Sequence, residues 1–348
     1  MRSNVTAQAC PAEGMGVHGK AARFVGTEGN TLPIANVRSA MSEPIPLTTE
    51  HSARATFEAL FDLSRTRQAL LSVAQPALGA VLALGALPSG SKMLLGLLAA
   101  STGFLAVFSL NDVLDRRVDA RALAAGKAEF EGFDLDTAFL RHPLARGDLS
   151  LRLAFVWVGT LSAVSAVCAY LLAPACLALF ALAVLLEIAY CSLRSVTWTK
   201  TFVSGVMVGV GGLAGWVAVA PLRREALPVF AFLALWEIAG RNLPNDLADI
   251  EADRRTGILT VATTFGPVVS AGATLVGALG TIASIALLPA ALPILLACIV
   301  LGIWAMGIPS LALRRTPTSV QAGAYFNRAS LLPALMLPVI AIGVLVVR

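Results

Sequence analysis

From Ala69 onward the chain alternates long apolar stretches with short polar breaks. A helix needs about 20 mainly apolar residues to cross a bilayer. Stretches that approach this length cover residues 69–87, 93–110, 153–172, 174–190, 202–220, 226–240, 267–288, 291–312 and 329–347. They predict an all-α, polytopic membrane protein with nine transmembrane helices.

The composition agrees with a membrane protein. Of the 348 residues, 57% are hydrophobic and only 14% are charged, whereas soluble domains carry roughly a quarter charged residues. The net charge of +5 does not indicate nucleic acid in a chain this apolar, because membrane proteins use basic loops for orientation. We therefore expect no nucleic-acid partner. The five cysteines form no CxxC pair and the histidines number only three, which argues against a disulfide framework or a His-based metal site.

The first part of the chain has a different composition. It contains Gly, Ser, Pro and Thr with scattered charges and no apolar periodicity, which is typical of disorder. It lacks the long apolar region of a signal peptide. We therefore expect a disordered tail over residues 1–55 and a membrane domain over residues 56–348.

Basic residues are unequally divided between the two sets of loops. The segment before the first helix and the loops after helices two, four, six and eight contain Arg65, Arg67, Arg116, Arg117, Arg121, Lys127, Arg141, Arg146, Arg194, Lys200, Arg241, Arg254, Arg255, Arg314, Arg315 and Arg328. The other face has Lys92, Arg223, Arg224 and Arg348. Because basic loops remain cytoplasmic, the bias predicts a multi-pass protein of the cell (inner) membrane with a cytoplasmic N-terminus.

One aspartate motif occurs twice, each time directly after an apolar helix. Residues 111–119 read NDVLDRRVD and residues 245–253 read NDLADIEAD, so both fit N-D-x-x-D-x-x-x-D. On a helix, this spacing places three carboxylates within about 60° of one face. Carboxylates this close repel each other and are costly near lipid. The motifs therefore indicate a bound cation.

Magnesium suits these residues, because it prefers a few carboxylates together with substrate phosphate oxygens. The candidate ligands are Asp112, Asp115, Asp119, Asp246, Asp249 and Asp253. Two facing clusters would hold a diphosphate between Mg²⁺ ions and polarise its leaving oxygen. The alternatives are solvated acidic helix ends and a cation-transport site. Duplication argues against the first alternative, and the position at helix ends rather than in mid-membrane argues against the second.

These motifs resemble those of the UbiA superfamily of intramembrane prenyltransferases, which carry NDxxDxxxD after helix two and a second aspartate-rich motif after helix six. The resemblance covers about residues 60–348 and includes RRTGI at 254–258 and PLARG at 143–147, although His142 stands where arginine is usual. It implies a nine-helix bundle that transfers a prenyl group, with Mg²⁺, from an allylic prenyl diphosphate to a lipophilic acceptor. That acceptor is typically an aromatic quinone precursor, and the partners are both substrates and membrane lipid.

The resemblance also implies roles for individual residues. Tyr190 and Arg194 match a Y-x-x-x-K-x-x-T pattern in which arginine replaces the lysine that is implied to contact the diphosphate. Arginine can pair with phosphate bidentately, although basic topology alone also accounts for an arginine at a helix end. The catalytic candidates are Asp112, Asp115, Asp246 and Asp249. The substrate-binding candidates are Asn111, Arg116, Tyr190, Arg194, Lys200, Arg241 and Asn245.

Several interpretations remain open at this point. Intramolecular capture of the prenyl cation would make the protein a membrane terpene cyclase, and ion coupling would make it a non-enzymatic transporter. Arg65 or Arg67 would supply a polar group to an acceptor pocket, or would only help to fix the orientation of the first helix in the membrane. The glycine-rich run at 205–215 indicates either close helix packing or a tunnel for the prenyl tail. The segment 120–142 is interpreted as an insertion rather than a cap.

Overall fold

The computed structural model describes residues 53–124 and 142–346. Its elements are helices, and no strand occurs within those two ranges. The predicted tail lies outside the described residues except for its last three, which begin the helix α2 (Ala53–Leu63). The predicted insertion at 120–142 lies outside them except at its two ends.

Nine helical segments among the described residues are long and apolar enough to cross a membrane. They are Thr66–Leu84, Gly90–Arg121, Leu151–Leu172, Pro174–Leu193, Lys200–Val217, Ala226–Ala248, Pro267–Ile285, Leu292–Arg315 and Ser319–Val346. Each overlaps one of the predicted stretches, so the prediction of an all-α, nine-helix membrane protein is confirmed.

Some of these spans are built from consecutive shorter helices. The first part of the chain forms α3 (Thr66–Ser72), α4 (Ala74–Leu84), α5 (Gly90–Ala124), α6 (Pro143–Arg146), α7 (Leu151–Leu172), α8 (Pro174–Leu193) and α9 (Lys200–Val217). The second part forms α10 (Ala226–Trp236), η1 (Glu237–Asn242), α11 (Leu243–Ala248), α12 (Ile250–Thr256), α13 (Val261–Phe265), α14 (Pro267–Ile285), α15 (Leu292–Gly302), η2 (Ile303–Gly307), α16 (Ile308–Arg315), α17 (Ser319–Ala329) and α18 (Leu332–Val346).

Three spans extend eight or more residues beyond their predicted bounds. Helix α5 continues through the first aspartate motif, because the Leu, Arg and Ala residues there favour helix and no Pro or Gly interrupts them. The sixth span continues past its predicted end through the π-helical turn η1 into α11. The ninth begins at Ser319, where the Thr318 hydroxyl caps the helix by accepting a bond of 3.3 Å from the Gln321 amide. These extensions contain polar residues, so they were not included in the continuous apolar stretches from which the spans were predicted.

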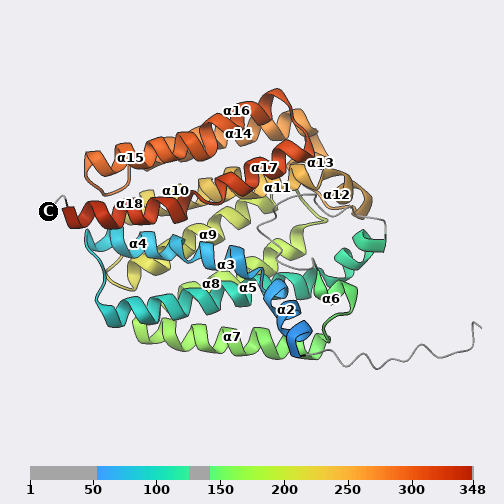
Figure 1. Cartoon of the computed structure of the whole chain (residues 1–348), viewed down its shortest axis with the longest axis horizontal. Coiled ribbons are helices and arrows are strands. Elements are labelled where there is room, and N and C mark those ends of the chain that lie inside the picture. Colours follow the sequence, from blue (N-terminus) through green and yellow to red (C-terminus); the bar gives the residue numbers. More distant parts are fainter. Residues whose placement is uncertain (1–52, 125–141, 347–348) are drawn as a thin grey trace, which may run out of the picture. The chain divides into compact units, whose positions relative to one another are not determined.

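The long helices lie side by side along one direction (Figure 1). Helix α9 is central, since it packs against α4, α8 and α10, while α5 packs along α7. The end of α5 and the helices α6, α12 and α13 gather at one end of this bundle (Figure 1). Both aspartate motifs therefore lie at the same end. This agrees with the order of the spans, because the motifs follow the second and the sixth span, which cross in the same direction.

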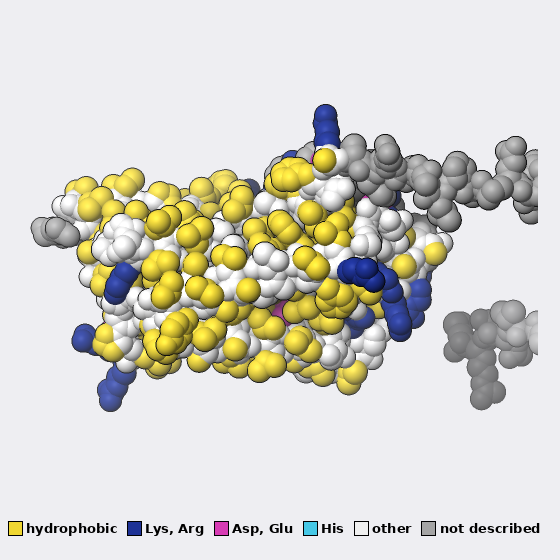
Figure 2. Space-filling model, turned by 90° about the horizontal axis from the view of Figure 1, so that it is seen from below, with side chains coloured by type: hydrophobic (Ala, Val, Ile, Leu, Met, Phe, Trp, Pro, Cys, Tyr) yellow, Lys and Arg dark blue, Asp and Glu magenta, His cyan; other side chains and the backbone are white. Residues whose placement is uncertain are grey.

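The surface matches a lipid environment. Figure 2 shows hydrophobic side chains spread along the face in view, with Lys and Arg gathered mostly towards its two ends. Large apolar residues such as Leu185, Val276 and Val300 are more than half exposed on the spans. In water such a surface would aggregate, whereas lipid tails solvate it. The chain is a multi-pass membrane protein.

Glycines let α9 approach its neighbours closely. A Cβ atom on Gly215 would overlap the backbone carbonyl oxygen of Pro76 in α4, and one on Gly79 would overlap the carbonyl of Gly212. Small residues at such crossings bring helix backbones together, which is a main source of association in lipid. Gly211 differs, because nothing lies within 4 Å of its Cβ position and it lines a cavity. Close packing therefore explains most of the glycine run, and one position opens into internal space.

Candidate functional site

A cavity of about 700 Å³ lies among the helices, with residues of both aspartate motifs in its lining. Sites for small molecules usually measure roughly 300–1,000 Å³. The lining extends from the motifs along the bundle to Met93 and Gly96 in the first turns of α5. The cavity therefore joins an acidic end to a long interior between the spans.

The first motif presents its acidic residues from the last turns of α5. Asn111, Asp112, Asp115 and Asp119 all line the cavity, and Asp112 is buried with 4% exposure. Their angular positions cover one arc of the helix, as predicted from the spacing. Arg116 does not line the cavity. It lies about 40° beyond Asp112 on the far edge of the arc, so its predicted substrate contact is not supported by its position.

The second motif lies at a break between two helices. Asn245 and Asp246 belong to α11, and Asp249 occupies the break with φ −94° and ψ 10° before α12 begins. These residues and Asp253 line the same cavity. Asp246 is buried, and its Oδ2 atom has no hydrogen-bond partner among the described residues. The continuous helix assumed from the spacing is thus interrupted, but the carboxylates still share one cavity.

Four cationic side chains near the motifs each face a carboxylate. The pairs are Arg65 with Asp112 at 3.3 Å, Arg194 with Asp115, Lys200 with Asp246 at 3.2 Å and Arg241 with Glu237 at 3.2 Å. A buried charge without a partner would cost several kcal/mol. The predicted residues Arg194, Lys200 and Arg241 therefore line the cavity together with the carboxylates that hold them in place.

The surroundings of Lys200 and Arg194 differ. Lys200 is 3% exposed and donates to the Tyr190 hydroxyl at 3.2 Å, which also accepts from the Asn242 amide at 3.1 Å. Arg194 lies in the loop between α8 and α9, where burial lowers the pKa of its guanidinium. Arginine nevertheless remains charged in proteins. Both side chains thus present fixed positive charge beside the acidic clusters.

His142 was not predicted as a site residue. Its Nδ1 lies 3.1 Å from Asp119 Oδ2, and ligand atoms of His142, Asp112 and Asp119 all lie within 4.8 Å of one another. Carboxylate oxygens and imidazole nitrogen are ordinary ligands of divalent metals. The unpartnered Asp246 Oδ2 is a further candidate ligand atom. The residues present therefore fit a divalent cation. The only sequence signal was the position of His142 just before the PLARG stretch.

Comparison with known families agrees with this geometry. The profile of the UbiA prenyltransferase family matches residues 72–331, which is most of the chain. The chain belongs to this family. No curated protein sequence gives a significant match.

Solved structures of UbiA homologues share the fold of this family member. One from Aeropyrum pernix K1 aligns with a TM-score of 0.65 at 20% identity, covering 81% of this chain and 98% of that one. One from Archaeoglobus fulgidus bound to DMAPP and Mg²⁺ aligns at 0.60 with 18% identity, covering 81% and 99%. A digeranylgeranylglyceryl phosphate synthase aligns at 0.56 with 16% identity, covering 83% and 98%. The predicted UbiA-type bundle is confirmed.

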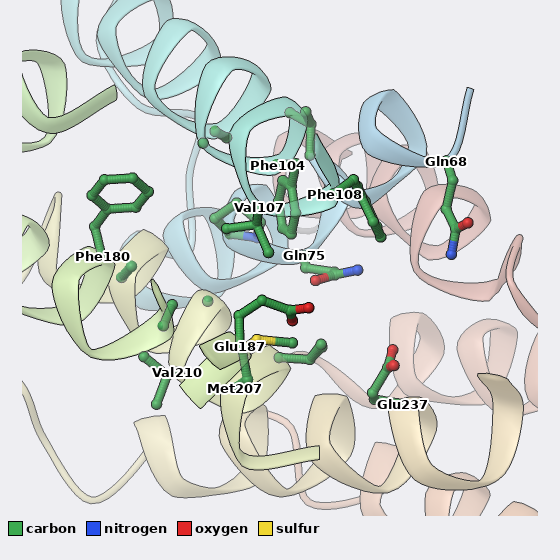
Figure 3. Close-up of a pocket in the computed structure, with 18 of the residues that line it drawn as sticks. Gln68, Gln75, Phe104, Val107, Phe108, Phe180, Glu187, Met207, Val210 and Glu237 are labelled. Atoms are coloured by element: carbon green, nitrogen blue, oxygen red, sulfur yellow. The ribbon is translucent and has the colours of Figure 1, made fainter. Parts of the chain in front are cut away.

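Sequence reasoning missed several polar residues that line the cavity of this UbiA protein away from the motifs. Figure 3 shows Gln68, Gln75, Glu187 and Glu237 among apolar neighbours. A glutamate within an apolar span is a signal in itself, because ionisable groups are costly in the membrane. Glu187 stands alone in a span of otherwise uncharged residues, so this signal was available in the sequence.

The π-helical turn η1 places one of these residues. Glu237, Arg241 and Asn242 all belong to it, and all three are buried and line the cavity. Extra residues in a π turn re-aim side chains and are frequent at functional sites. The Glu237 carboxylate accepts a bond of 2.9 Å from the Ser204 hydroxyl in α9. No local sequence pattern predicts such a turn.

The rest of the interior is apolar and aromatic. Phe104, Val107 and Phe108 enter it from α5, and Phe180 and Val210 from α8 and α9 (Figure 3). Such a surface binds hydrocarbon rather than ions. The cavity thus combines an acidic, cation-flanked end with an interior suited to an apolar chain.

Proposed function

We propose that the protein transfers a prenyl group from an allylic prenyl diphosphate to a lipophilic, aromatic acceptor, with Mg²⁺ as its metal. The observation that carries this proposal is the shared cavity, in which both aspartate motifs line a space that continues into an apolar interior. Homologous structures bound to DMAPP with Mg²⁺ and to GPP with Mg²⁺ support it. A cation transporter has no use for such an apolar interior.

Different residues at the acidic end would bind the metal, pair with the diphosphate and orient both. The candidate metal ligands are Asp112, Asp115, Asp119, Asp246, Asp249 and Asp253. These carboxylates would hold Mg²⁺, which when bound would supply positive charge to the leaving diphosphate. Arg65, Arg194 and Lys200 would pair with diphosphate oxygens that the metal leaves unbound. Asn111, Tyr190 and Asn245 would orient the carboxylates and the diphosphate through hydrogen bonds.

The reaction follows from this arrangement. The C1–O bond of the donor breaks, and its electron pair leaves with pyrophosphate. An electron pair of the acceptor then forms the new bond to C1, and the acceptor loses a proton. The prenyl tail would lie in the apolar interior against Phe104 and Phe108, where water that would quench the allylic cation is excluded.

The decisive experiment measures pyrophosphate release by purified protein with geranyl, farnesyl or geranylgeranyl diphosphate. We expect release with Mg²⁺, a loss of at least about a hundredfold on chelation with EDTA, and recovery when Mg²⁺ is added back. Product analysis with and without aromatic acceptors follows the prenyl group. Release that needs an acceptor and yields a prenylated product supports transfer.

The remaining outcomes separate the alternatives. A cyclised hydrocarbon formed without any acceptor would identify a terpene cyclase. No release under any condition, with Mg²⁺ binding intact, would reject the enzymatic function. Ion-dependent uptake into vesicles without product would then favour transport.

The orientation in the membrane forms a further part of the proposal. The basic residues at the motif end outnumber those at the other end, which supports a cytoplasmic location for the motifs and the N-terminus. Cysteine substitutions at the exposed positions Arg224 and Arg255 would test this with a membrane-impermeant thiol reagent. We expect intact cells to be labelled at position 224 only, and labelling at position 255 only would reverse the orientation.

A further inference from the structure

The transfer reaction leaves the binding of the acceptor unexplained. Three polar side chains enter the middle of the cavity from different helices: Gln75 from α4, Glu187 from α8 and Glu237 from η1 (Figure 3). Their exposed fractions are 0%, 3% and 6%. Burying an amide or a carboxylate is costly unless it is hydrogen-bonded. Glu187 and Glu237 offset this cost through hydrogen bonds and an ion pair within the protein, so the remaining cost falls on Gln75.

Gln75 provides the most direct evidence for a ligand. It is fully buried and lines the cavity, yet neither its Nε2 nor its Oε1 atom has a hydrogen-bond partner among the described residues. An unpaired buried polar group costs about 1–3 kcal/mol. The amide can donate through Nε2 and accept through Oε1. A ligand group that does both, such as a hydroxyl, would satisfy it.

Glu187 lies between the acidic cluster and the apolar interior, beside the place where the reacting carbon of a bound donor would lie. Its Oε1 accepts a bond of 2.7 Å from the Asn111 amide and a longer one of 3.4 Å from the Cys191 thiol. Asn111 directly precedes the motif residue Asp112. One hydrogen bond thus separates Glu187 from the acidic cluster, and apolar side chains lie on its other side (Figure 3). A donor with its diphosphate on the aspartates would place C1 at this boundary.

Charge at this level disfavours an acidic acceptor. The guanidinium of Arg241 pairs with Glu237 Oε2 at 3.2 Å, and Arg65 faces Asp112 and Asn111 at the motif level. Both guanidinium groups are thus engaged by acidic residues of the protein. An acceptor carboxylate in the middle of the cavity would lie beside the carboxylates of Glu187 and Glu237. Like charges repel strongly where water is scarce. A neutral hydroxyl would instead donate to either carboxylate.

We propose that Gln75, Glu187 and Glu237 form the acceptor subsite and select an uncharged hydroxyl-bearing acceptor, such as a phenol or hydroquinone, over one that carries a carboxylate. This inference rests on the prenyl transfer proposed above. The carboxylates accept hydrogen bonds from the acceptor hydroxyl, and the Gln75 amide completes its coordination.

The test compares acceptors that differ by a single carboxylate. Hydroquinone is paired with gentisate, and para-cresol with para-hydroxybenzoate, each with Mg²⁺ and geranylgeranyl diphosphate. The readouts are the kcat/KM of product formation and the acceptor-induced shift in melting temperature without donor. We expect the neutral member of each pair to be favoured at least about tenfold, and Gln75→Leu to raise its KM while the donor KM stays constant.

Charge-neutral variants identify the residues responsible. Glu187→Gln and Glu237→Gln should reduce the preference for the neutral acceptor at least about fivefold, because the acid then meets less repulsion. Glu225→Gln is the matched control, since Glu225 is exposed in the loop before α10 and does not line the cavity. The control should keep the wild-type preference.

Failure of the inference is distinguishable from failure of the proposed function. Equal or better use of the acids, or an unchanged preference in folded Glu187→Gln and Glu237→Gln, would overturn the subsite. Absence of both product and acceptor binding would also overturn it, provided that pyrophosphate release persists. Absence of Mg²⁺-dependent binding of a non-reacting prenyl thiolodiphosphate would instead contradict prenyl-diphosphate chemistry itself.

Discussion

Replacing Asp112 or Asp246 with asparagine should abolish pyrophosphate release. We expect losses of at least about a thousandfold, which corresponds to roughly 4 kcal/mol of transition-state stabilisation. Asparagine keeps the size of the side chain and one oxygen but removes the negative charge that holds a divalent cation. Both aspartates are buried and line the shared cavity. The measurement is the initial rate of release at saturating donor and Mg²⁺.

A carboxylate from the same motif provides the control. Glu251 lies between Asp249 and Asp253, but it is exposed, pairs with Arg254 at 3.1 Å and does not line the cavity. Glu251→Gln should keep the wild-type rate. This contrast separates metal binding from the general acidity of the segment.

Folding must be measured alongside activity in these variants. Asp246 faces the buried Lys200. Removal of one partner of a buried ion pair typically costs about 3–5 kcal/mol of stability. Asp112 faces Arg65, which is partly exposed, so we expect a smaller loss of stability there. Monodisperse elution and a cooperative melt define a folded variant. A folded Asp112→Asn protein with a rate within tenfold of wild type, on the scale of about 1.4 kcal/mol, would contradict the metal assignment.

The features that the sequence predicted correctly are those imposed by lipid and by repetition. A bilayer fixes the length of an apolar span, so nine stretches corresponded to nine helices. The duplicated motif marked the acidic end, because two identical spacings after spans of matching direction must face the same side. Tyr190, Arg194, Lys200 and Arg241, which the sequence predicts as substrate-binding residues, also line the cavity.

The features that were missed depend on packing between distant segments. Gln75, Glu187 and Glu237 lie in three spans, and only the assembled bundle brings them to one cavity. Arg116 does not line the cavity, because proximity to a motif in sequence does not fix the angular position of a side chain on a helix. His142 is distant in sequence from Asp112 and Asp119, so no local pattern indicated that the three side chains lie close together.

The glycine run shows why composition alone left two interpretations open. Glycine in a membrane helix is equally consistent with close packing and with internal space. The surroundings of each glycine decide between them. Gly215 meets the backbone of α4, whereas Gly211, one turn earlier, meets the open cavity. The same residue type thus serves two purposes on one helix.

Gly215→Ala should destabilise the protein more than any other single methyl added to α9. The new Cβ would overlap the carbonyl oxygen of Pro76, a backbone atom that cannot rotate away. Helix α4 must then shift, and overpacking of this kind costs about 1–3 kcal/mol or more. We expect a lower melting temperature in detergent and a smaller monodisperse fraction than in wild type.

Gly211→Ala is the control, because it adds the same methyl to the same helix where no atom lies within 4 Å. It should melt as wild type does, and equal melting of the two variants would refute the close α4–α9 contact. The destabilised variant should also lose acceptor affinity, since Pro76 follows Gln75 directly and a shift of α4 moves that amide. Donor affinity should change less, because α5 and the segment from α11 to α12 carry the aspartates. A packing defect would then act on one substrate selectively, through the helix that connects the glycine contact to the acceptor subsite.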